Sequence, residues 1–360
     1  MEKRNKYSPD IAIPPGVTLL EVLEELGMTQ AELAERTARP TKTINEIIKG
    51  KAAITPETAL QLETVLKVPA RFWNNLEMNY RETLARIEER EVLQEQLEWL
   101  KGVPVNSMAR FGWIKKNSDS IEQLKEVLSF FGVASVRGWE KTWDKQLGCA
   151  FRKSNKYEMD RIALAAWLRA GQLEAKDVAC QPFDSERFLG ILPDIRKLTI
   201  TDPDVFVTKV RELCSATGVA VIFVRELPKL PVNGVTYWPS TNKAIIQLTL
   251  RYKADDQLWF SFFHEAAHIL KHGKRDFYEE FSDDTEGWEQ EANAFAADLL
   301  IPADAFKYFA SRRIFDEHTI QVFANSVGIA PGIVVGRLQH EGLLSYSSRL
   351  NRLKKKFFLG

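Results

Sequence analysis

Two histidines four residues apart form the part of this sequence best suited to chemistry. They belong to the segment His264-Glu265-Ala266-Ala267-His268, in which a glutamate follows the first histidine directly. On a helix, positions i and i+4 share a face, so both imidazoles can bind one cation while Glu265 stands beside it as a proton acceptor. The apolar neighbours expected to bury the rest of this helix are Trp259, Phe260, Phe262, Phe263, Ile269 and Leu270. The segment therefore predicts a metal site on a buried helix.

A third metal ligand is available in the next helix expected along the chain, WEQEANAFAADLLIP, which ends at Pro302. This helix carries two carboxylates, Glu289 and Glu291, and the residue types alone do not choose between them. Two histidines and one glutamate, with a fourth position left to water, are typical zinc ligands of hydrolytic sites. One alternative is that the histidines and the glutamate only satisfy each other. His272, one turn beyond the pair, is interpreted as a cation at the helix end rather than as a ligand.

A second kind of chemistry is indicated near the N-terminus, where two short helices follow each other closely. Their segments are TQAELAERT and TKTINEIIKG, the first opened by a capping box of Thr29 and Glu32. A pair of this kind can place its second helix in the major groove of DNA. Once the isoleucines of the second helix face inward, the side chains left for DNA are Thr41, Lys42, Thr43, Asn45 and Lys49, with Gln30 from the first helix reaching the backbone. Asn can pair with adenine edges, while Lys and Thr serve phosphates or bases. A helical module that only mediates protein contacts is the alternative.

The elements that must position these residues are mainly helical. Helical spacing of apolar residues covers the N-terminal part and the middle of the chain, and β-branched runs at 218–226, 234–238 and 243–250 predict three strands of a small sheet. The predicted fold class is therefore mainly α with a small β-sheet, an α+β fold. The predicted domains are a helix-turn-helix bundle (1–80), a charged connector helix (81–101), a helical middle region (102–195), a C-terminal domain with the metal site (196–348) and a basic tail (349–360).

Composition excludes several classes of protein. The chain has 360 residues with 49 basic and 49 acidic side chains, so any DNA binding must come from a local patch and not from bulk charge. No signal peptide and no apolar stretch of membrane-spanning length occurs, which predicts a cytoplasmic protein with no membrane partner. Three widely spaced cysteines form no CxxC pair and are expected to be small buried hydrophobes: Cys149, Cys180 and Cys214.

The N-terminal segment from about 15 to 80 resembles the XRE-type helix-turn-helix, and specifically its HigA-type antitoxin version. The matching residues are Gly27, Thr29-Gln30, Leu33-Ala34, Ile44, Gly50, the run Ile54 to Ala59, Leu62 and Phe72-Trp73-Asn75-Leu76. The resemblance implies operator binding as a homodimer and a toxin protein as partner. Two positions depart from the family: Ala38 replaces the usual turn glycine, which strains the backbone if its φ is positive, and Arg39 replaces an apolar residue.

The C-terminal part, from about Gly218 to Leu344, resembles the ImmA/IrrE-type zinc peptidases, which implies a zincin-like fold. The resemblance rests on KAIIQLTLRYKADDQ, WFSFFHEAAHILKHG, EQEANAFAADLLIP and VGIAPGIVVGRLQHEGLL, which occur in this order. It implies zinc as cofactor, Glu265 as general base, and His264, His268 and Glu291 as ligands. Glu291 is preferred over Glu289 because it directly precedes Ala292-Asn293, as in the family block.

Together these features predict a DNA-binding regulator or antitoxin that carries a zinc-dependent endopeptidase domain. Its expected substrate is a helix-turn-helix repressor, or its own linker around 81–101, with the substrate strand paired to KAIIQLTL as the sheet edge. The alternative is an antitoxin and autorepressor whose metal-binding domain is catalytically silent. The segment FANSVGIAPGIVVGRLQ resembles a second helix-turn-helix but is interpreted as core packing, and RLNRLKKKFFLG is expected to be a solvated tail.

Overall fold

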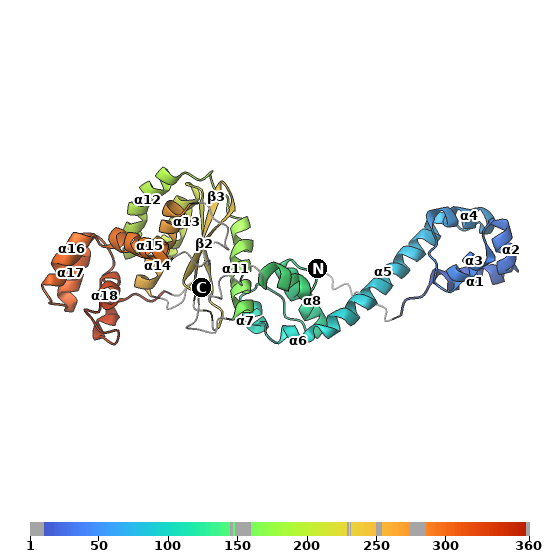
Figure 1. Ribbon diagram of the computed structural model, residues 1–360, viewed down its shortest axis with the longest axis horizontal. Coiled ribbons are helices and arrows are strands. Elements are labelled where there is room, and N and C mark those ends of the chain that lie inside the picture. The colour runs from blue at the N-terminus through green and yellow to red at the C-terminus, as the bar shows by residue number, and fades with distance from the viewer. Residues whose placement is uncertain are drawn as a thin grey trace. The chain divides into compact units, whose positions relative to one another are not determined.

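The computed structural model describes residues 11–144, 147, 160–228, 230, 232–249, 254–273 and 286–357. The chain divides into two compact units, Met1–Glu98 and Trp99–Gly360, which are described separately here (Figure 1). The mainly helical α+β fold class predicted from the sequence is confirmed. Of the three cysteines predicted to be buried, Cys214 is buried and Cys180 is half-buried. Cys149 lies outside the described residues.

The first unit is built from short helices in a row. They are α1 (Pro15–Glu25), α2 (Gln30–Arg36), α3 (Thr41–Ile48), α4 (Pro56–Leu66) and the long α5 (Ala70–Glu95). The predicted capping box is present: the Thr29 hydroxyl accepts a hydrogen bond from the Glu32 amide, and the Glu32 carboxylate accepts one from the Thr29 amide. Thr55 caps α4 by accepting a hydrogen bond from the Thr58 amide. The predicted start of α2 is therefore confirmed.

One apolar core holds the first unit together. Its buried members are Leu19, Leu23, Leu33, Ala34, Ile44, Ile47, Ile48, Ile54, Ala59, Leu62, Leu66, Ala70 and Trp73. Helices α1 and α3 approach so closely that a Cβ on Gly16 would lie 2.2 Å from the Ile48 carbonyl oxygen. At the base of α5, the buried Glu77 accepts a hydrogen bond of 2.9 Å from the Ile54 amide. The charged connector helix predicted over 81–101 is the outer part of α5, which begins in this core and ends earlier than predicted, at Glu95.

The second unit contains most of the remaining elements. After α6 (Leu97–Leu100) come α7 (Val105–Arg110), α8 (Ser120–Phe131), α9 (Val136–Trp139), the π-helical η1 (Glu140–Asp144), α11 (Arg161–Lys176), α12 (Ser185–Lys197), the 3-10 turn η2 (Leu198–Ile200) and α13 (Pro203–Ser215). The strands are β1 (Val219–Val224), β2 (Gly234–Ser240) and β3 (Lys243–Thr249). The later helices are α14 (Asp255–Lys271), α15 (Glu286–Leu300), α16 (Ala303–Ser311), α17 (Glu317–Val327), α18 (Pro331–His340) and the 3-10 turn η3 (Arg349–Leu353).

The three strands form a mixed sheet in the order β1-β3-β2. β1 pairs with β3 in parallel, with Val221 opposite Ile246, and β2 pairs with β3 antiparallel, with Thr236 opposite Ile246. The prediction that KAIIQLTL is an edge strand is therefore wrong, because β3 lies in the centre. Its burial explains the position: residues 244 to 249 are all buried, as expected for a strand covered on both faces and paired on both sides.

Each face of the sheet is covered by a separate apolar core. Alternate strand residues point to opposite faces, so Val221 and Ile246 join a core formed with α13 and α14, whereas Ile222 and Ile245 join one formed with α8 and α11. The predicted middle region thus shares its core with the sheet instead of packing alone. This shared core could not be predicted, because helical periodicity indicates which face of a helix is apolar but not which element covers that face.

The basic segment after residue 348 is docked on the second unit as far as Phe357. Phe357 is buried and its ring lies 5.1 Å from that of Phe206. The Asp255 amide donates to the Lys355 carbonyl oxygen, and Lys354 Nζ lies 2.6 Å from Asp256 Oδ2. The expectation of a solvated tail is wrong for these residues, because the first turn of α14 buries two carboxylates that this segment helps to satisfy.

α17 and α18 enclose a turn at Gly328, whose φ is +72°. Buried side chains from both helices, including Ile320 and Val334, belong to the same core as α14, which confirms that core packing is their first role. Within the described residues, no single helix is long and apolar enough to cross a membrane. These two helices reach that length and apolarity only together, as a pair bent by 108°.

Candidate metal centre and DNA-binding helices

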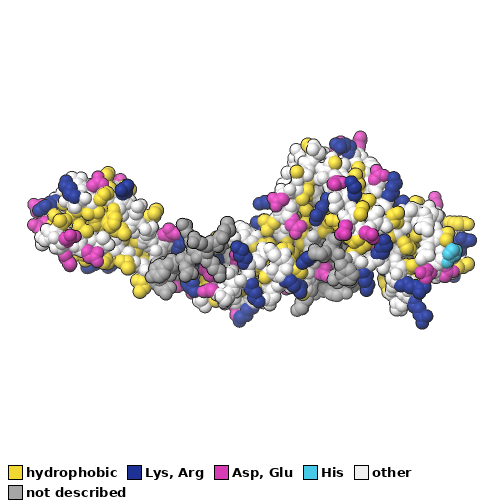
Figure 2. Space-filling view, turned by 180° about the vertical axis from the view of Figure 1, so that it is seen from behind, with side chains coloured by type: hydrophobic (Ala, Val, Ile, Leu, Met, Phe, Trp, Pro, Cys, Tyr) yellow, Lys and Arg dark blue, Asp and Glu magenta, His cyan; other side chains and the backbone are white. Residues whose placement is uncertain are grey.

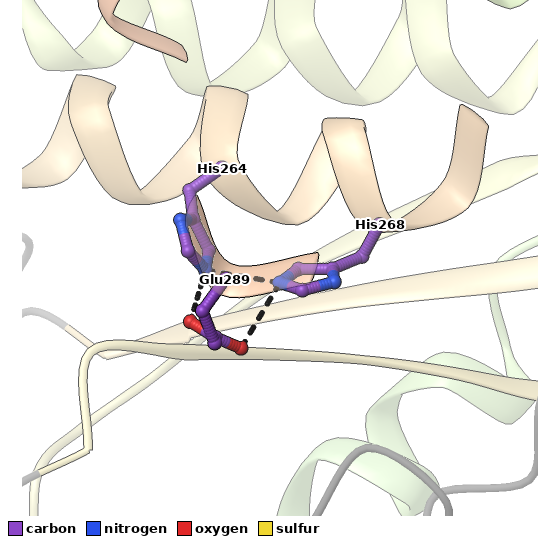
Figure 3. Close-up of side chains that lie close together, drawn as sticks. All are labelled: His264, His268 and Glu289. Atoms are coloured by element: carbon purple, nitrogen blue, oxygen red, sulfur yellow. Dashed lines mark hydrogen bonds and ion pairs between the residues drawn. The ribbon is translucent and has the colours of Figure 1, made fainter. Parts of the chain in front are cut away.

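The two histidines of the HExxH segment lie on one face of α14 with their Nε2 atoms turned toward each other. The two Nε2 atoms are 3.0 Å apart, and 15% and 9% of the His264 and His268 side chains are exposed (Figure 3). The predicted apolar neighbours bury the opposite faces of α14, with Phe262 and Phe263 at the centre of the core. Helix α14 thus presents a pair of imidazoles from an otherwise buried element, as the spacing predicts.

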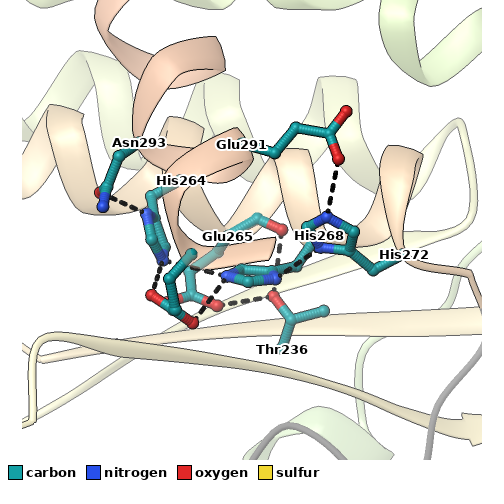
Figure 4. A network of polar contacts seen from close by, with 8 residues as sticks. Thr236, His264, Glu265, His268, His272, Glu291 and Asn293 are labelled. Carbon is teal, nitrogen blue, oxygen red and sulfur yellow. Dashed lines mark hydrogen bonds and ion pairs between the residues drawn. The ribbon is translucent and has the colours of Figure 1, made fainter. Parts of the chain in front are cut away.

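The carboxylate that joins the pair is Glu289 and not Glu291. The two oxygens of Glu289 lie 3.3 Å from His264 Nε2 and 3.5 Å from His268 Nε2. Glu291 instead contacts His272 Nε2 at 3.3 Å (Figure 4). Its other oxygen lies 3.2 Å from Lys271 Nζ. The placement predicted for Glu291 is therefore wrong. Residues two apart on a helix point about 200° away from each other, so α15 can offer only one of its two glutamates to the pair.

The three donor groups fit a tetrahedral zinc ion. Ligand atoms about 2.05 Å from zinc at the corners of a tetrahedron lie about 3.3 Å from one another. The three distances among His264 Nε2, His268 Nε2 and the Glu289 oxygens are 3.0, 3.3 and 3.5 Å. Two nitrogens and one oxygen are also a donor set that zinc accepts. Within the described residues, His264, His268 and Glu289 form the group of histidines and carboxylates whose donor atoms lie close enough together to bind one ion.

Glu265 lies beside this cluster and is held by the sheet. Its Oε2 accepts a hydrogen bond of 2.9 Å from the Thr236 hydroxyl, and only 5% of the residue is exposed. Strand β2 passes so close that a Cβ on Gly234 would lie 2.8 Å from Glu265 Oε1. The sequence did not single out either β2 residue, because their relation to Glu265 depends on how the strand packs on α14.

The imidazoles and carboxylates of the cluster stabilise each other's charged forms. Burial lowers the pKa of His264, but the hydrogen bond with Glu289 and the charge of Glu265 outweigh it, so that this pKa is raised above its ordinary value. The hydrogen bond with His264 in turn lowers the pKa of Glu289. A cation bound by these groups therefore replaces a proton that the cluster already attracts.

A cleft of about 650 Å³ connects the cluster with the end of α18. Its walls include two of the three donor residues, His264 and Glu289, together with Glu265. Apolar side chains such as Phe260 and Ile333 line the rest, and Arg337 lies farther along. Phe260 thus faces the cleft in addition to the core. The cleft gives a substrate access to the cluster from solvent.

In the first unit, the predicted DNA-contacting residues lie on the outer side of the helix pair. Thr41, Lys42 and Lys49 are exposed, and Thr43, Asn45 and Gln30 are half-buried. Lys42 Nζ lies 3.9 Å from Glu46, so one of the two lysines has an acidic neighbour on the same face. Basic and acidic side chains are interspersed on the visible surface of this unit (Figure 2). Residues 1–80 contain ten basic and eleven acidic side chains.

The two departures from the expected helix-turn-helix pattern have structural consequences. Ala38 adopts φ +52°, so it carries the strain expected where glycine is usual. Arg39 is half-buried and its Nε donates a hydrogen bond of 2.5 Å to Gln61 of α4. Arg39 thus joins two helices of the unit instead of pointing to the DNA-facing side.

Comparison with known proteins assigns families to both regions. Residues 214–338 match the family described as the IrrE N-terminal-like domain of the M78 peptidases, and residues 19–73 match the helix-turn-helix family. The matched ranges contain the imidazole pair with Glu289 and the helix pair α2–α3, respectively.

Individual relatives match only part of the chain. The helix-turn-helix transcriptional regulator YddM of Escherichia coli is 35% identical over 63 residues, which are 18% of this chain and 67% of that protein. Virulence-associated protein A of Dichelobacter nodosus is 38% identical over 68 residues, with the same two shares. Among solved structures, an addiction module antidote protein of the HigA family from Coxiella burnetii is 32% identical, covers 23% of this chain and 92% of its own, and has a TM-score of 0.22.

Proposed function

Since this chain belongs to the XRE-type helix-turn-helix proteins and carries an IrrE-like domain of the M78 peptidases, we propose that it is a DNA-binding regulator with a zinc-dependent endopeptidase. The observation that carries the peptidase half is the convergence of His264, His268 and Glu289 beside Glu265 in an open cleft. We also propose that the protein is cytoplasmic, because a bacterial regulator meets its operator DNA there.

The residues of the cluster divide the chemistry of peptide hydrolysis among themselves. A zinc ion held by the two imidazoles and Glu289 would polarise the scissile carbonyl and make hydroxide available at neutral pH. Glu265 takes the proton of the attacking water and returns it to the leaving amine. The Thr236 hydroxyl donates a hydrogen bond to one Glu265 oxygen and thereby fixes the orientation of the carboxylate for this transfer.

The substrate is proposed to bind as an extended strand along β2. Because β3 is central, β2 is an outer strand of the described sheet, and it is the strand that passes beside Glu265. Backbone pairing with β2 positions a peptide bond next to the cluster without reading its sequence. The class of substrate that we propose is a helix-turn-helix repressor or a segment of this chain near 81–101.

Cleavage of the chain's own connector requires local unfolding. α5 is helical through Glu95, and α6 begins at Leu97, so most of 81–101 has its backbone groups paired within helices. An extended strand in the cleft cannot keep those hydrogen bonds. The turn at Gln96 is therefore the favoured place for the connector to open.

The N-terminal unit is proposed to bind operator DNA as a homodimer, with a toxin as a further partner. In this proposal Asn45 on α3 and Lys49 at the C-terminal cap of α3 enter the major groove, and Lys42 contacts a phosphate. Replacing Asn45 by alanine should cost about 1–3 kcal/mol of operator binding, and replacing Lys42 should weaken binding to all sequences alike. Footprinting on the protein's own promoter tests this half, and no protection would contradict it.

The peptidase half is tested by metal analysis combined with cleavage. The purified chain should contain one zinc per molecule and cut a repressor substrate, and a chelator should stop the cutting. Glu265→Gln should abolish cleavage while sparing the metal. Glu289→Gln should lose the metal, whereas the exposed His318, changed to Phe, should alter neither.

The rival function is an antitoxin and autorepressor with a catalytically silent metal-binding domain. It predicts metal binding and promoter protection, but no cleavage of either repressor or connector by the wild type. Intact substrates after long incubation with the zinc-loaded chain would therefore favour the rival and refute the peptidase proposal.

A further inference from the structure

A row of polar contacts leads from the metal site away from the cleft. His268 Nδ1 lies 2.9 Å from His272 Nδ1, and His272 Nε2 lies 3.3 Å from Glu291 Oε2 (Figure 4). The His272 side chain is only 4% exposed, and its ring stacks on that of Trp288 with a centroid distance of 5.5 Å. Lys271 Nζ holds the other oxygen of Glu291 at 3.2 Å. The row thus ends on an anchored carboxylate.

The position of each proton in this row follows from the end that faces the cation. His268 can bind a metal through Nε2 only if that nitrogen carries a lone pair, so its proton must sit on Nδ1. Nδ1 then donates to His272 Nδ1, which must be unprotonated. The remaining His272 proton is on Nε2, where it donates to the Glu291 carboxylate. With both imidazoles neutral, this arrangement of protons satisfies the two contacts of the row, His268 to His272 and His272 to Glu291.

The other histidine of the pair, His264, also has a hydrogen-bond partner at its Nδ1 atom, here a single side chain. His264 Nδ1 lies 3.0 Å from the Asn293 Oδ1 atom, so it donates there and leaves Nε2 free for the cation. Asn293 is four residues after Glu289 and shares its side of α15. Glu291 leaves the helix on another side and reaches His272, one turn farther along α14. Helix α15 therefore supplies both the carboxylate ligand and the ends of both orienting contacts.

We propose that His272 and Glu291 act as one positioning relay for the metal ligand His268. They fix the tautomer and the ring orientation of His268 and raise its basicity toward a cation, in the way that carboxylates orient ligating histidines elsewhere. The inference rests on the proposed metal site, but it assigns Glu291 and His272 a role outside the ligand set. It also explains why a buried imidazole stands at the end of α14.

The test measures the zinc affinity of the full-length chain by competition with a chromophoric chelator, for the wild type and for variants of the row and of the ligand set. His272→Phe keeps the ring stacked on Trp288 but removes both nitrogens, and it should weaken zinc binding about 10–100-fold. His272→Gln restores an acceptor and a donor and should recover most of that loss. Glu291→Ala should weaken binding by less than His272→Phe. His318→Phe, at an exposed histidine outside the row, is the control and should stay within about twofold of the wild type.

A second readout separates orientation from a general loss of structure. Cobalt bound in place of zinc should show a changed visible absorption spectrum in His272→Phe and a nearly wild-type spectrum in His272→Gln. Circular dichroism monitors the fold of every variant.

The outcomes distinguish this inference from the proposed function. Zinc affinity of His272→Phe within about twofold of the wild type would overturn the relay while leaving the metal site intact. Equal loss in His272→Phe and His272→Gln would assign His272 to the ligand set or to packing, and overturn it too. Loss of all binding in Glu291→Ala with retention in Glu289→Gln would make Glu291 the ligand. A wild-type chain that binds no zinc would end both proposals.

Discussion

The ion pair between Lys354 and Asp256 is predicted to stabilise α14, the helix that carries the imidazole pair. Asp256, in the first turn of α14, is 5% exposed, and its Oδ2 lies 2.6 Å from Lys354 Nζ. Lys354 also donates to Gln339 Oε1 at 2.8 Å, and Gln339 is itself buried. Changing Lys354 to Met keeps the length and apolar stem of the side chain but leaves the Asp256 carboxylate buried and without its cation.

The expected cost is about 3–5 kcal/mol, because removing one partner of a buried ion pair leaves an uncompensated charge. The double variant Lys354→Met/Asp256→Asn removes that charge as well and should recover much of the stability. The non-additivity of the two changes gives their coupling. The exposed pair of Lys197 and Asp194, 2.8 Å apart, provides a matched control, and Lys197→Met should cost less than about 1 kcal/mol.

Urea unfolding followed by tryptophan fluorescence is a suitable assay. Of the nine tryptophans, Trp73 alone precedes residue 99, so the signal reports almost wholly on the second unit. Lys354→Met unfolding within about 1 kcal/mol of the wild type would refute the reasoning. It would mean that the carboxylate finds water or another partner without the lysine.

Three further predictions concern single side chains. Burial is the main cause that raises the pKa of Asp255 to about 7, above the value of about 3.9 in an unfolded chain. Its stabilising contribution is therefore complete below about pH 4 and is lost as the pH rises to about 7, so Asp255→Asn should flatten the fall in urea midpoint over that range. Ala38→Gly should stabilise the first unit by about 1 kcal/mol, seen as slower hydrogen exchange of the buried amides around Leu33, and faster exchange would contradict the strain at φ +52°. Gly234→Ala should displace the Glu265 carboxylate and slow cleavage about a hundredfold with zinc content unchanged, whereas an unaltered rate would show that the strand can move aside.

The sequence identified the local features of the site but not the choice between neighbours. The HExxH spacing correctly places both imidazoles on one face of α14, because that relation is contained in a single helix. Which of Glu289 and Glu291 faces them depends on how α15 is rotated about its axis against α14. A comparison of the two possible helix faces would have shown that Glu289 and Asn293 share one side, which favours the former.

Contacts between distant segments were the least predictable part of the fold. Strand patterns located all three strands, yet the central position of β3 follows from a parallel pairing with β1 that no local pattern contains. The docking of Lys354 and Phe357 was hidden for a different reason. Their partners, Asp256 and Phe206, are remote in sequence, and a run of lysines is usually solvated.

The support of α14 by Lys354 has a consequence for how the protein is made. The two partners of that pair are 98 positions apart, whereas the whole apolar core of the first unit lies between Leu19 and Trp73. Short-range contacts form early and long-range contacts wait for their partner to emerge from the ribosome. The helix-turn-helix unit can therefore fold during synthesis, well before Lys354 is available to anchor α14, and a nascent chain completes its two units in that order.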